Sequence, residues 1–360
     1  MDINFTQANE IYLPKILRLN NSLDISLYND LIKNNSVLVY DCIYNQLQEL
    51  IKCQNPSVNI QSEEYAEYIS KHLQEQNINN YGVWVYYPWN NKLIHLLDKE
   101  EFIKVRTNRN QYKITNNEQQ LLNTKKIGIV GLSVGQSIAL TMAIERTCGE
   151  LRLADFDTVE LSNLNRLRAP LHSLGLKKTV IAAREILEID PFISVKVYND
   201  GLNSDNIDTF FTEGGNLDLF VEVCDGLDIK IQSRYKAREL KIPVVMDTND
   251  RGMLDVERFD LEPNRAILHG RLGNSIINTQ NMAPNEKLDL IYKIIDVDKI
   301  SSKLKFSIPE IGKSINTWPQ LASSTFLGGA VTTDISRKIL LGNHTASGRY
   351  YVDFDEILST

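Results

Sequence analysis

A short apolar segment that ends in a glycine turn opens the most regular part of this sequence. Residues 126–130 (Lys-Ile-Gly-Ile-Val) lead directly into Gly131, and the residues after Gly135 have a helical pattern. Apolar and helical segments then alternate, which predicts strands at residues 150–154, 193–198, 217–223 and 242–246 and helices at 177–189, 204–211 and 228–240. Short buried strands that alternate with helices form a parallel sheet covered on both faces. The sequence therefore predicts an α/β fold with a mostly parallel sheet.

Residues 1–100 lack this alternation and predict a separate, small α+β domain of unassigned role. Helices are expected at residues 37–51 and 63–73. Two strand-like segments, 83–87 and 93–97, flank turn residues, a pattern typical of a hairpin. We expect the second domain to occupy residues 101–360.

Charge and hydropathy exclude several classes of protein. Lys and Arg number 39 against 46 Asp and Glu, giving a net charge of −7 and no excess of basic residues for nucleic-acid or membrane-surface binding. No apolar segment approaches the ~18–20 residues of a membrane span, and the first residues lack a secretory signal pattern. We expect a globular cytoplasmic enzyme or binding module that contacts neither nucleic acid nor membrane.

The cysteines and histidines give no metal-binding pattern. The four cysteines form no C-x-x-C pair and the five histidines have no zinc-site spacing, so we expect no zinc. Cys148 and Cys224 adjoin predicted strands and are expected to be buried, unreactive thiols.

The glycine turn lies where parallel sheets bind nucleotides. Gly131-Leu-Ser133-Val-Gly135 follows the first strand, and a helix N-terminus there offers free N–H groups to phosphate. Its spacing is G-x-S-x-G rather than G-x-G-x-x-G. Asp155 follows the second strand, where it either binds ribose hydroxyls or caps the next turn. At this point NAD and ATP both remain possible.

The segment from Asp155 to Arg166 favours one family. Its sequence, Asp-Phe-Asp-Thr-Val-Glu-Leu-Ser-Asn-Leu-Asn-Arg, resembles the D-x-D-x-V-x-x-S-N-L-x-R signature of the ubiquitin-activating-enzyme-like superfamily, which includes the ThiF, MoeB and HesA adenylyltransferases. The resemblance covers residues 101–360 and implies a Rossmann-like sheet. Further matches in the same order are Arg106-Thr-Asn-Arg109-Asn110, Gly175-Leu-Lys-Lys178, Asp190-Pro191 and Cys224-Asp225.

The resemblance implies ATP- and Mg²⁺-dependent activation of a carboxylate as an acyl-adenylate. Such a reaction needs cations around the phosphates and a carboxylate for the metal. The implied roles are ribose binding by Asp155, phosphate binding by Arg166 and Lys178, ordering of the phosphate region by Asn163, Mg²⁺ binding by Asp225, and for Arg109 an arginine finger into the partner subunit of a homodimer. Gly131, Ser133 and Gly135 would form the loop around the nucleotide.

Three departures from the family pattern bear on the mechanism. The glycine turn is one residue shorter than the family's. No cysteine follows Cys224, so we expect no thioester step on this chain. The stretch from Asp247 to Arg258 is unusually charged, and Asp247 and Asp250 either recognise an amine-bearing substrate or belong to a solvated loop.

The substrate and two alternative functions stay open at this stage. A ubiquitin-like protein, a peptide C-terminus or a small acid would each fit the chemistry. An NAD-dependent oxidoreductase explains the glycines and Asp155 but not the cations, and a non-catalytic scaffold explains the shortened turn. Small residues after Trp318 predict a helix that packs closely on the helix after the glycine turn, and residues 349–354 predict a strand that closes the sheet.

Overall fold

The computed structural model describes residues 9–273, 277, 279 and 282–359. The chain divides into two compact units. The first unit consists of Met1–Asn117 with Leu187–Phe192, and the second of Glu118–Ile186 with Ile193–Thr360.

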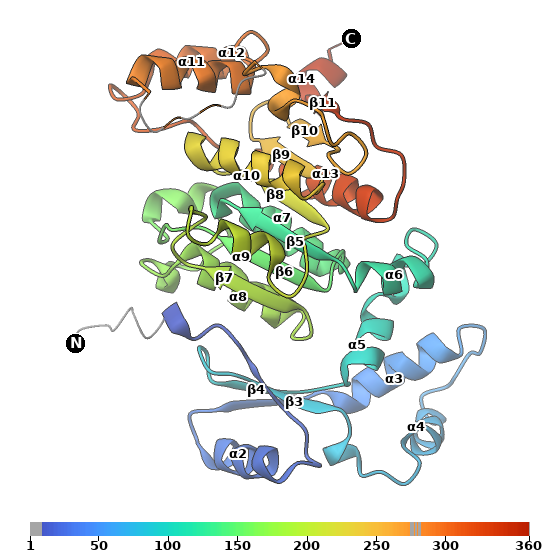
Figure 1. The fold of residues 1–360 in the computed structure, drawn as a ribbon. Helices are drawn as coiled ribbons and strands as arrows, with labels where there is room; N and C mark the ends of the chain where they lie inside the picture. The colour runs from blue at the N-terminus through green and yellow to red at the C-terminus, as the bar shows by residue number, and fades with distance from the viewer. Residues whose placement is uncertain (1–8, 274–276, 278, 280–281, 360) are drawn as a thin grey trace. The chain divides into compact units, whose positions relative to one another are not determined.

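The second unit is built on a seven-stranded sheet with the order β11-β10-β9-β8-β5-β6-β7 (Figure 1). The neighbours from β7 to β9 are parallel, whereas β10 is antiparallel to both β9 and β11. The mostly parallel α/β prediction is therefore confirmed. The strands are β5 (Lys126–Val130), β6 (Glu150–Ala154), β7 (Ser194–Tyr198), β8 (Leu219–Glu222), β9 (Val244–Thr248), β10 (Met253–Glu257) and β11 (Gly348–Tyr351).

The strand order creates a switch point between β5 and β8. The chain moves outward from β5 to β6 and β7, and then returns to the other side of β5 at β8. Crevices at the carboxyl ends of such strands are where open α/β sheets bind ligands. The turn after β5 and the turn after β8 therefore meet at the expected binding edge.

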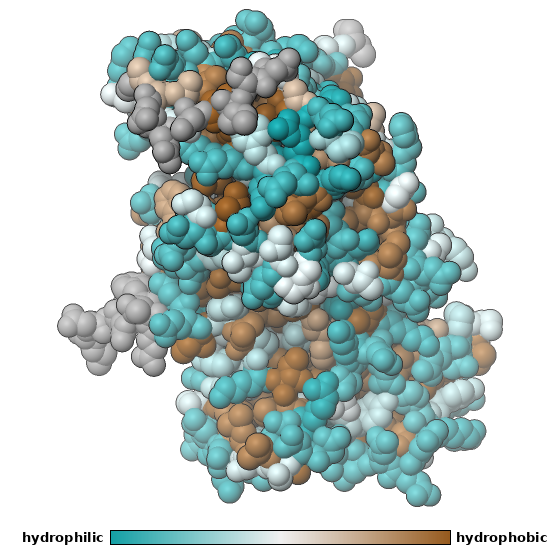
Figure 2. Space-filling view, viewed as in Figure 1, coloured by the Kyte–Doolittle hydropathy of each residue, from teal (hydrophilic) through white to brown (hydrophobic). Residues whose placement is uncertain are grey.

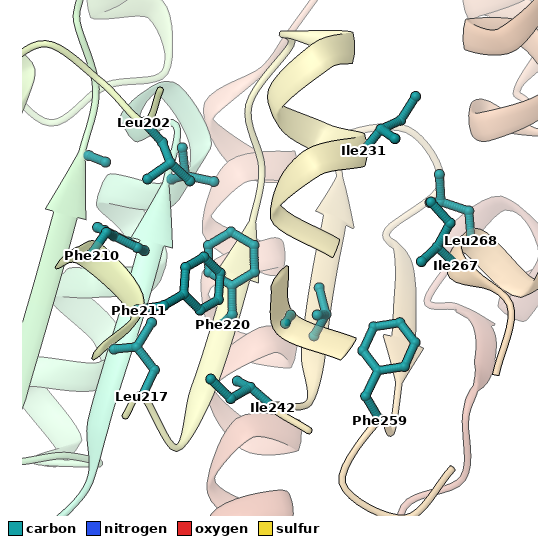
Figure 3. Close-up of a cluster of buried hydrophobic side chains, with 14 of the residues drawn as sticks. Leu202, Phe210, Phe211, Leu217, Phe220, Ile231, Ile242, Phe259, Ile267 and Leu268 are labelled. Carbon is teal, nitrogen blue, oxygen red and sulfur yellow. The ribbon is translucent and has the colours of Figure 1, made fainter. Parts of the chain in front are cut away.

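Helices cover both faces of this sheet. In Figures 1 and 3, α9 and α10 lie in front of the strands and α13 lies behind them. The helices of the unit and its borders are α6 (Asn116–Leu122), α7 (Leu132–Glu145), α8 (Lys178–Ile189), α9 (Ile207–Thr212), α10 (Leu227–Glu239), α11 (Pro284–Ile295), α12 (Ser302–Ser307), α13 (Ala322–Leu340) and α14 (Phe354–Ile357). Short 3₁₀ turns are η3 (Leu161–Asn165), η4 (Leu171–Ser173), η5 (Ile267–Gly270) and η6 (Ile308–Glu310).

The helix predicted after Trp318 is α13, and it packs against α7 as expected. A Cβ added at Gly329 would lie 2.9 Å from the carbonyl oxygen of Ser137 on α7. Glycine therefore lets the two helix backbones approach closely. The predicted closing strand is β11, at the edge of the sheet.

Aliphatic and phenylalanine side chains fill the core on the face covered by α9 and α10 (Figure 3). Phe210 and Phe211 of α9 and Phe220 of β8 are fully buried, and the Phe211 and Phe220 rings lie 4.9 Å apart between centroids. Burying one such ring stabilises the fold by about 1.5–3 kcal/mol. This core holds β8 in place, and the turn after β8 carries Asp225.

The charged stretch of residues 247–258 includes the end of β9 and the buried strand β10, so a fully solvated loop is the wrong description of it. Asp255 and Glu257 of β10 are fully buried. Asp255 accepts from His269 Nε2 at 2.9 Å and from Arg349 Nε at 2.6 Å. Glu257 accepts from Arg234 Nε at 2.7 Å. Buried charges persist when they are paired in this way.

The first unit holds a four-stranded sheet with the order β1-β3-β4-β2. The predicted hairpin is confirmed, because β3 and β4 pair antiparallel with Trp84 opposite His95. The elements are β1 (Lys15–Leu17), α2 (Ser22–Lys33), β2 (Leu38–Asp41), α3 (Ile43–Gln54), α4 (Tyr65–Leu73), η1 (Ile78–Asn80), β3 (Val83–Tyr87), β4 (Lys92–Leu96), α5 (Lys99–Arg106) and η2 (Asn108–Asn110).

The helix predicted at residues 37–51 is wrong in its first part. Residues Leu38–Asp41 form β2, which pairs parallel with β4, and the helix begins only at Ile43. The side-chain carboxylate of Asp41 holds the ring of buried His95, at 2.9 Å from Nδ1. Pairing with a distant strand overrides the local helical pattern here.

The face drawn in Figure 2 is mostly hydrophilic, with apolar side chains in separate areas. None of the helices in the described part of the chain is long and apolar enough to cross a membrane.

Candidate functional site

The turn between β5 and α7 requires a glycine. Gly131 has a φ of +88°, and a Cβ there would lie 2.6 Å from the carbonyl oxygen of Val223. α7 begins at the next residue, and the N–H groups of a helix's first turn have no partner within the helix. Gly135 lets α7 pack closely on β5, since its Cβ would lie 2.8 Å from Ile129. The turn thus presents a helix N-terminus at the switch point of the sheet, as the predicted phosphate loop requires.

Asp155 fixes the start of α7. Its Oδ2 accepts from the N–H of Leu132 at 2.6 Å, and its Oδ1 accepts from the N–H of Asp157 at 2.8 Å. Burial raises the pKa of this carboxyl, whereas the two backbone hydrogen bonds and the charge of Lys178 act in the opposite direction. The capping role left open by the sequence is therefore present. Its predicted role in ribose binding stays a prediction.

Lys178, the first residue of α8, lies near Asp155. Its side chain is buried, and its ammonium donates to Asp157 Oδ2 at 2.7 Å. Its backbone N–H donates to the carbonyl of Asp157 at 3.1 Å, so the residue is held at both ends. The cation therefore lies beside the Asp155 carboxylate and the N-terminus of α7.

Arg166 contacts the glycine turn from the other side. Its Nε donates to Ser133 Oγ at 3.0 Å, and one of its terminal nitrogens donates to Asn165 Oδ1 at 2.8 Å. Partial burial lowers the pKa of the guanidinium, and the negative charge of Asp225 counteracts that shift. Asn163 supports this arrangement, because its Oδ1 accepts from the N–H of Glu160 and closes the η3 turn.

Asp225 lies on the turn after β8, where its side chain is exposed at a cavity of about 760 Å³. The wall of the cavity includes apolar residues of α11 and the segment around Trp318. Cys224 also lines this cavity and is partly exposed, unlike the buried Cys148. Burial and the neighbouring Glu222 raise the pKa of the Cys224 thiol.

The structure brings most of the predicted site residues together. Ser133, Arg166 and Asp225 form one group, and Asp155 and Lys178 form another. The hydrogen bond from Leu132, the first residue of α7, to Asp155 joins the two groups. Arg109 lies on η2 of the first unit, and its predicted role in a partner subunit stays a prediction.

Asp157 was not predicted to be a functional residue, whereas Asp247 was predicted as a candidate for amine recognition but not as a buried group. Asp157 belongs to the motif but had no assigned role, and it is the carboxylate that holds Lys178. Asp247 lies at the end of β9 and lines the cavity, where it is only 4% exposed. Neither of its carboxylate oxygens has a hydrogen-bond partner among the described residues, and burial raises its pKa to about 7. The charged stretch from Asp247 to Arg258 was the sequence signal for this position.

The side chains suit a Mg²⁺ ion that arrives with a nucleotide. Within the described ranges, no three His, Cys, Asp or Glu side chains are grouped to hold a metal. Mg²⁺ keeps several waters and typically takes one or two carboxylates together with substrate phosphates. Asp225, exposed beside Arg166 and the α7 N-terminus, fits that limited role.

Comparison with known proteins identifies the family of this region. Residues 106–251 match the family model described as the ThiF family. An uncharacterized protein of Mycobacterium tuberculosis is 41% identical over 276 residues, which are 76% of this chain and 38% of that protein. A molybdopterin-synthase adenylyltransferase of Haemophilus influenzae is 29% identical over 149 residues, 41% of this chain and 59% of the enzyme. The chain thus covers less than two thirds of either relative.

A solved structure supports the fold. The crystal structure of E. coli MccB with MccA-N7isoASN has a TM-score of 0.51 and 15% sequence identity, covering 88% of this chain and 85% of MccB. The family model covers the glycine turn, Asp155, Arg166, Lys178 and Asp225, which all lie within residues 106–251. The chain therefore carries a ThiF-family domain over residues 106–251.

Proposed function

We propose that this chain is an ATP- and Mg²⁺-dependent adenylyltransferase that activates a carboxylate as an acyl-adenylate. The observation that carries the proposal is the convergence of Arg166, Lys178 and Asp225 on the N-terminus of α7, within a ThiF-family domain. The adenylyltransferase activity of the Haemophilus influenzae relative supports the same reaction type.

The site would act by alignment and electrostatics. A carboxylate oxygen attacks the α-phosphorus of ATP, a P–O bond forms, and the bond to the departing pyrophosphate breaks with its electrons. Arg166, Lys178 and the helix N-terminus would offset the charge that develops on the phosphate oxygens. Asp225 would hold Mg²⁺ against the phosphates, and Asp155 would bind the ribose.

Lys178 must change partners in this scheme. Its ammonium now binds Asp157 at 2.7 Å. A triphosphate carries more negative charge than one carboxylate, so it competes for the same ammonium. The flexible four-carbon stem of lysine allows that exchange without movement of α8.

The acyl-adenylate would be the product passed on, without a thioester on this chain. Cys224 lines the cavity, and its raised thiol pKa opposes formation of the nucleophilic thiolate. The acceptor would then attack the adenylate directly. We further propose that the protein is a cytoplasmic homodimer in which Arg109 completes the partner's site.

ATP–pyrophosphate exchange with candidate carboxylates tests this function. We expect exchange in the wild type and a loss of at least about 100-fold in Asp225→Ala, because removing one preorganised electrostatic group costs about that much. Asp355→Ala is the matched control, since it removes an exposed carboxylate from the same cavity rim. Unchanged exchange in Asp225→Ala would disprove the metal role. Binding of NADH in place of ATP would favour an oxidoreductase, and binding of neither nucleotide would favour a scaffold.

A further inference from the structure

The carboxylate of Asp247 is anomalous among the charged groups of the cavity. It is 4% exposed, it lines the cavity, and both of its oxygens lack a hydrogen-bond donor among the described residues. Leaving a buried polar atom unpaired costs about 1–3 kcal/mol, and more when it is charged. A cationic donor would remove this cost, and the described residues place none on the carboxylate.

The other carboxylates around the cavity already have partners or contact water. Asp250 accepts from the backbone N–H of Ser301 at 2.7 Å and from its hydroxyl at 2.6 Å. Asp353 is paired with Arg251. Asp225 is exposed. Among these carboxylates, Asp247 is distinguished by being buried and by having no hydrogen-bond partner in the described part of the chain.

Of the three cations among the described residues that line the cavity, two are paired with carboxylates other than Asp247. The ammonium of Lys230 donates to both carboxylate oxygens of Glu222 at 2.8 Å. Arg251 is paired with Asp353 and Glu356. Lys303 lies exposed on α12. Burial raises the pKa of Asp247, and neither carboxylate oxygen has a hydrogen-bond partner among the described residues.

The backbone of α13 is shaped around this carboxylate. A Cβ added at Gly328 would lie 2.2 Å from Asp247 Oδ2. Glycine therefore leaves the space in which the carboxylate sits. In the same cavity, Ile291, Ile294 and Ile295 of α11 contribute an apolar part of the wall. An acidic group and an apolar wall in one cavity suit a ligand with an aliphatic part and a cationic end.

We propose that Asp247 binds a positively charged nitrogen of the substrate, so that the carboxylate activated by this chain belongs to an amine-bearing molecule. This substrate class rests on the adenylyltransferase function proposed above. The ammonium would supply the missing donors and the opposite charge together, whereas a neutral amide would leave the buried charge uncompensated.

Direct binding of simple amines tests the proposal without ATP. The full-length chain is titrated calorimetrically at about pH 8 with a series of primary alkylamines from propyl to octyl and with the matched alkanols. We expect at least one amine to bind about 10- to 100-fold more tightly than its alkanol, in keeping with a hydrogen bond between charged groups. That preference should vanish in Asp247→Asn and persist in Asp355→Asn.

A second variant keeps the test independent of the charge change. Gly328→Ala retains the carboxylate but places a Cβ in its position, and it should weaken amine binding as well. Equal binding of amines and alkanols to the wild type, or an amine preference that survives in Asp247→Asn, would overturn the proposal.

The failure of this proposal can be told apart from failure of the proposed function. Loss of ATP binding in the wild type would refute the adenylyltransferase activity and would leave the amine titrations unaffected. Exchange that an amino acid and its N-acetyl derivative support equally well would refute the substrate class and leave the activity standing.

Discussion

Replacing Asp247 with Asn should stabilise the protein at neutral and alkaline pH. The carboxyl is buried without a partner among the described residues, and burial raises its pKa from 3.8 to about 7. Between these two values the folded state holds a proton that the unfolded state has released. The free energy of unfolding of the wild type therefore falls as the pH rises through this window.

The size of this loss of stability follows from the rise in the pKa of Asp247. A change of about 3 pKa units at 1.36 kcal/mol each corresponds to about 4 kcal/mol of destabilisation above pH ~7. Asn removes that penalty but leaves an amide whose buried donors and acceptor cost about 1–3 kcal/mol. We therefore expect Asp247→Asn to be about 1–3 kcal/mol more stable than the wild type at pH ~8, and no more stable at pH ~4.

Urea denaturation of both proteins at several pH values measures this difference. Comparing the two proteins at each pH cancels the titration of all other groups. Asp250→Asn is the matched control, because its carboxylate accepts two hydrogen bonds from Ser301 and its loss should destabilise. A stability difference between wild type and Asp247→Asn that does not change with pH would refute the assignment of an unpaired buried carboxylate.

Three further predictions concern packing, buried charge and nucleotide binding. Gly329→Ala should lower the free energy of unfolding, measured in urea, by about 1–3 kcal/mol, because the added Cβ would lie 2.9 Å from a carbonyl oxygen of α7. The control Ser323→Ala, at an exposed position of α13, should leave that free energy unchanged. Arg234→Met should cost about 3–5 kcal/mol in the same assay, since it leaves buried Glu257 without its guanidinium, and a loss under about 1 kcal/mol would contradict this. Lys178→Met should weaken ATP binding at least about 10-fold in a calorimetric titration, with Lys177→Met as control.

Much of the second unit could be predicted from sequence because its strands are buried on both faces. Residues 126–130 and 150–154 form β5 and β6 at the predicted bounds, since a continuous apolar segment has few alternatives inside a parallel sheet. The glycine turn was equally predictable, because the positive φ of Gly131 admits few other residues. Such local constraints are visible in the sequence itself.

The features that the sequence did not predict depend on distant partners. β2 is a strand because it pairs with β4, which follows it in the chain only after α3, α4 and β3. Asp255 and Glu257 look solvated beside Arg251 and Arg258, yet their partners include His269, Arg349 and Arg234. The pairing of Asp157 with Lys178 and the absence of a described partner for Asp247 likewise depend on the folded arrangement.

A crystal structure of the protein with Mg²⁺ and a non-hydrolysable ATP analogue tests the central claim most directly. The account predicts the α-phosphate at the N-terminus of α7, with Arg166 and Lys178 on the phosphate oxygens and Asp225 on the metal. Lys178 should have left Asp157. A nucleotide bound elsewhere, or phosphates that contact neither cation, would contradict the account.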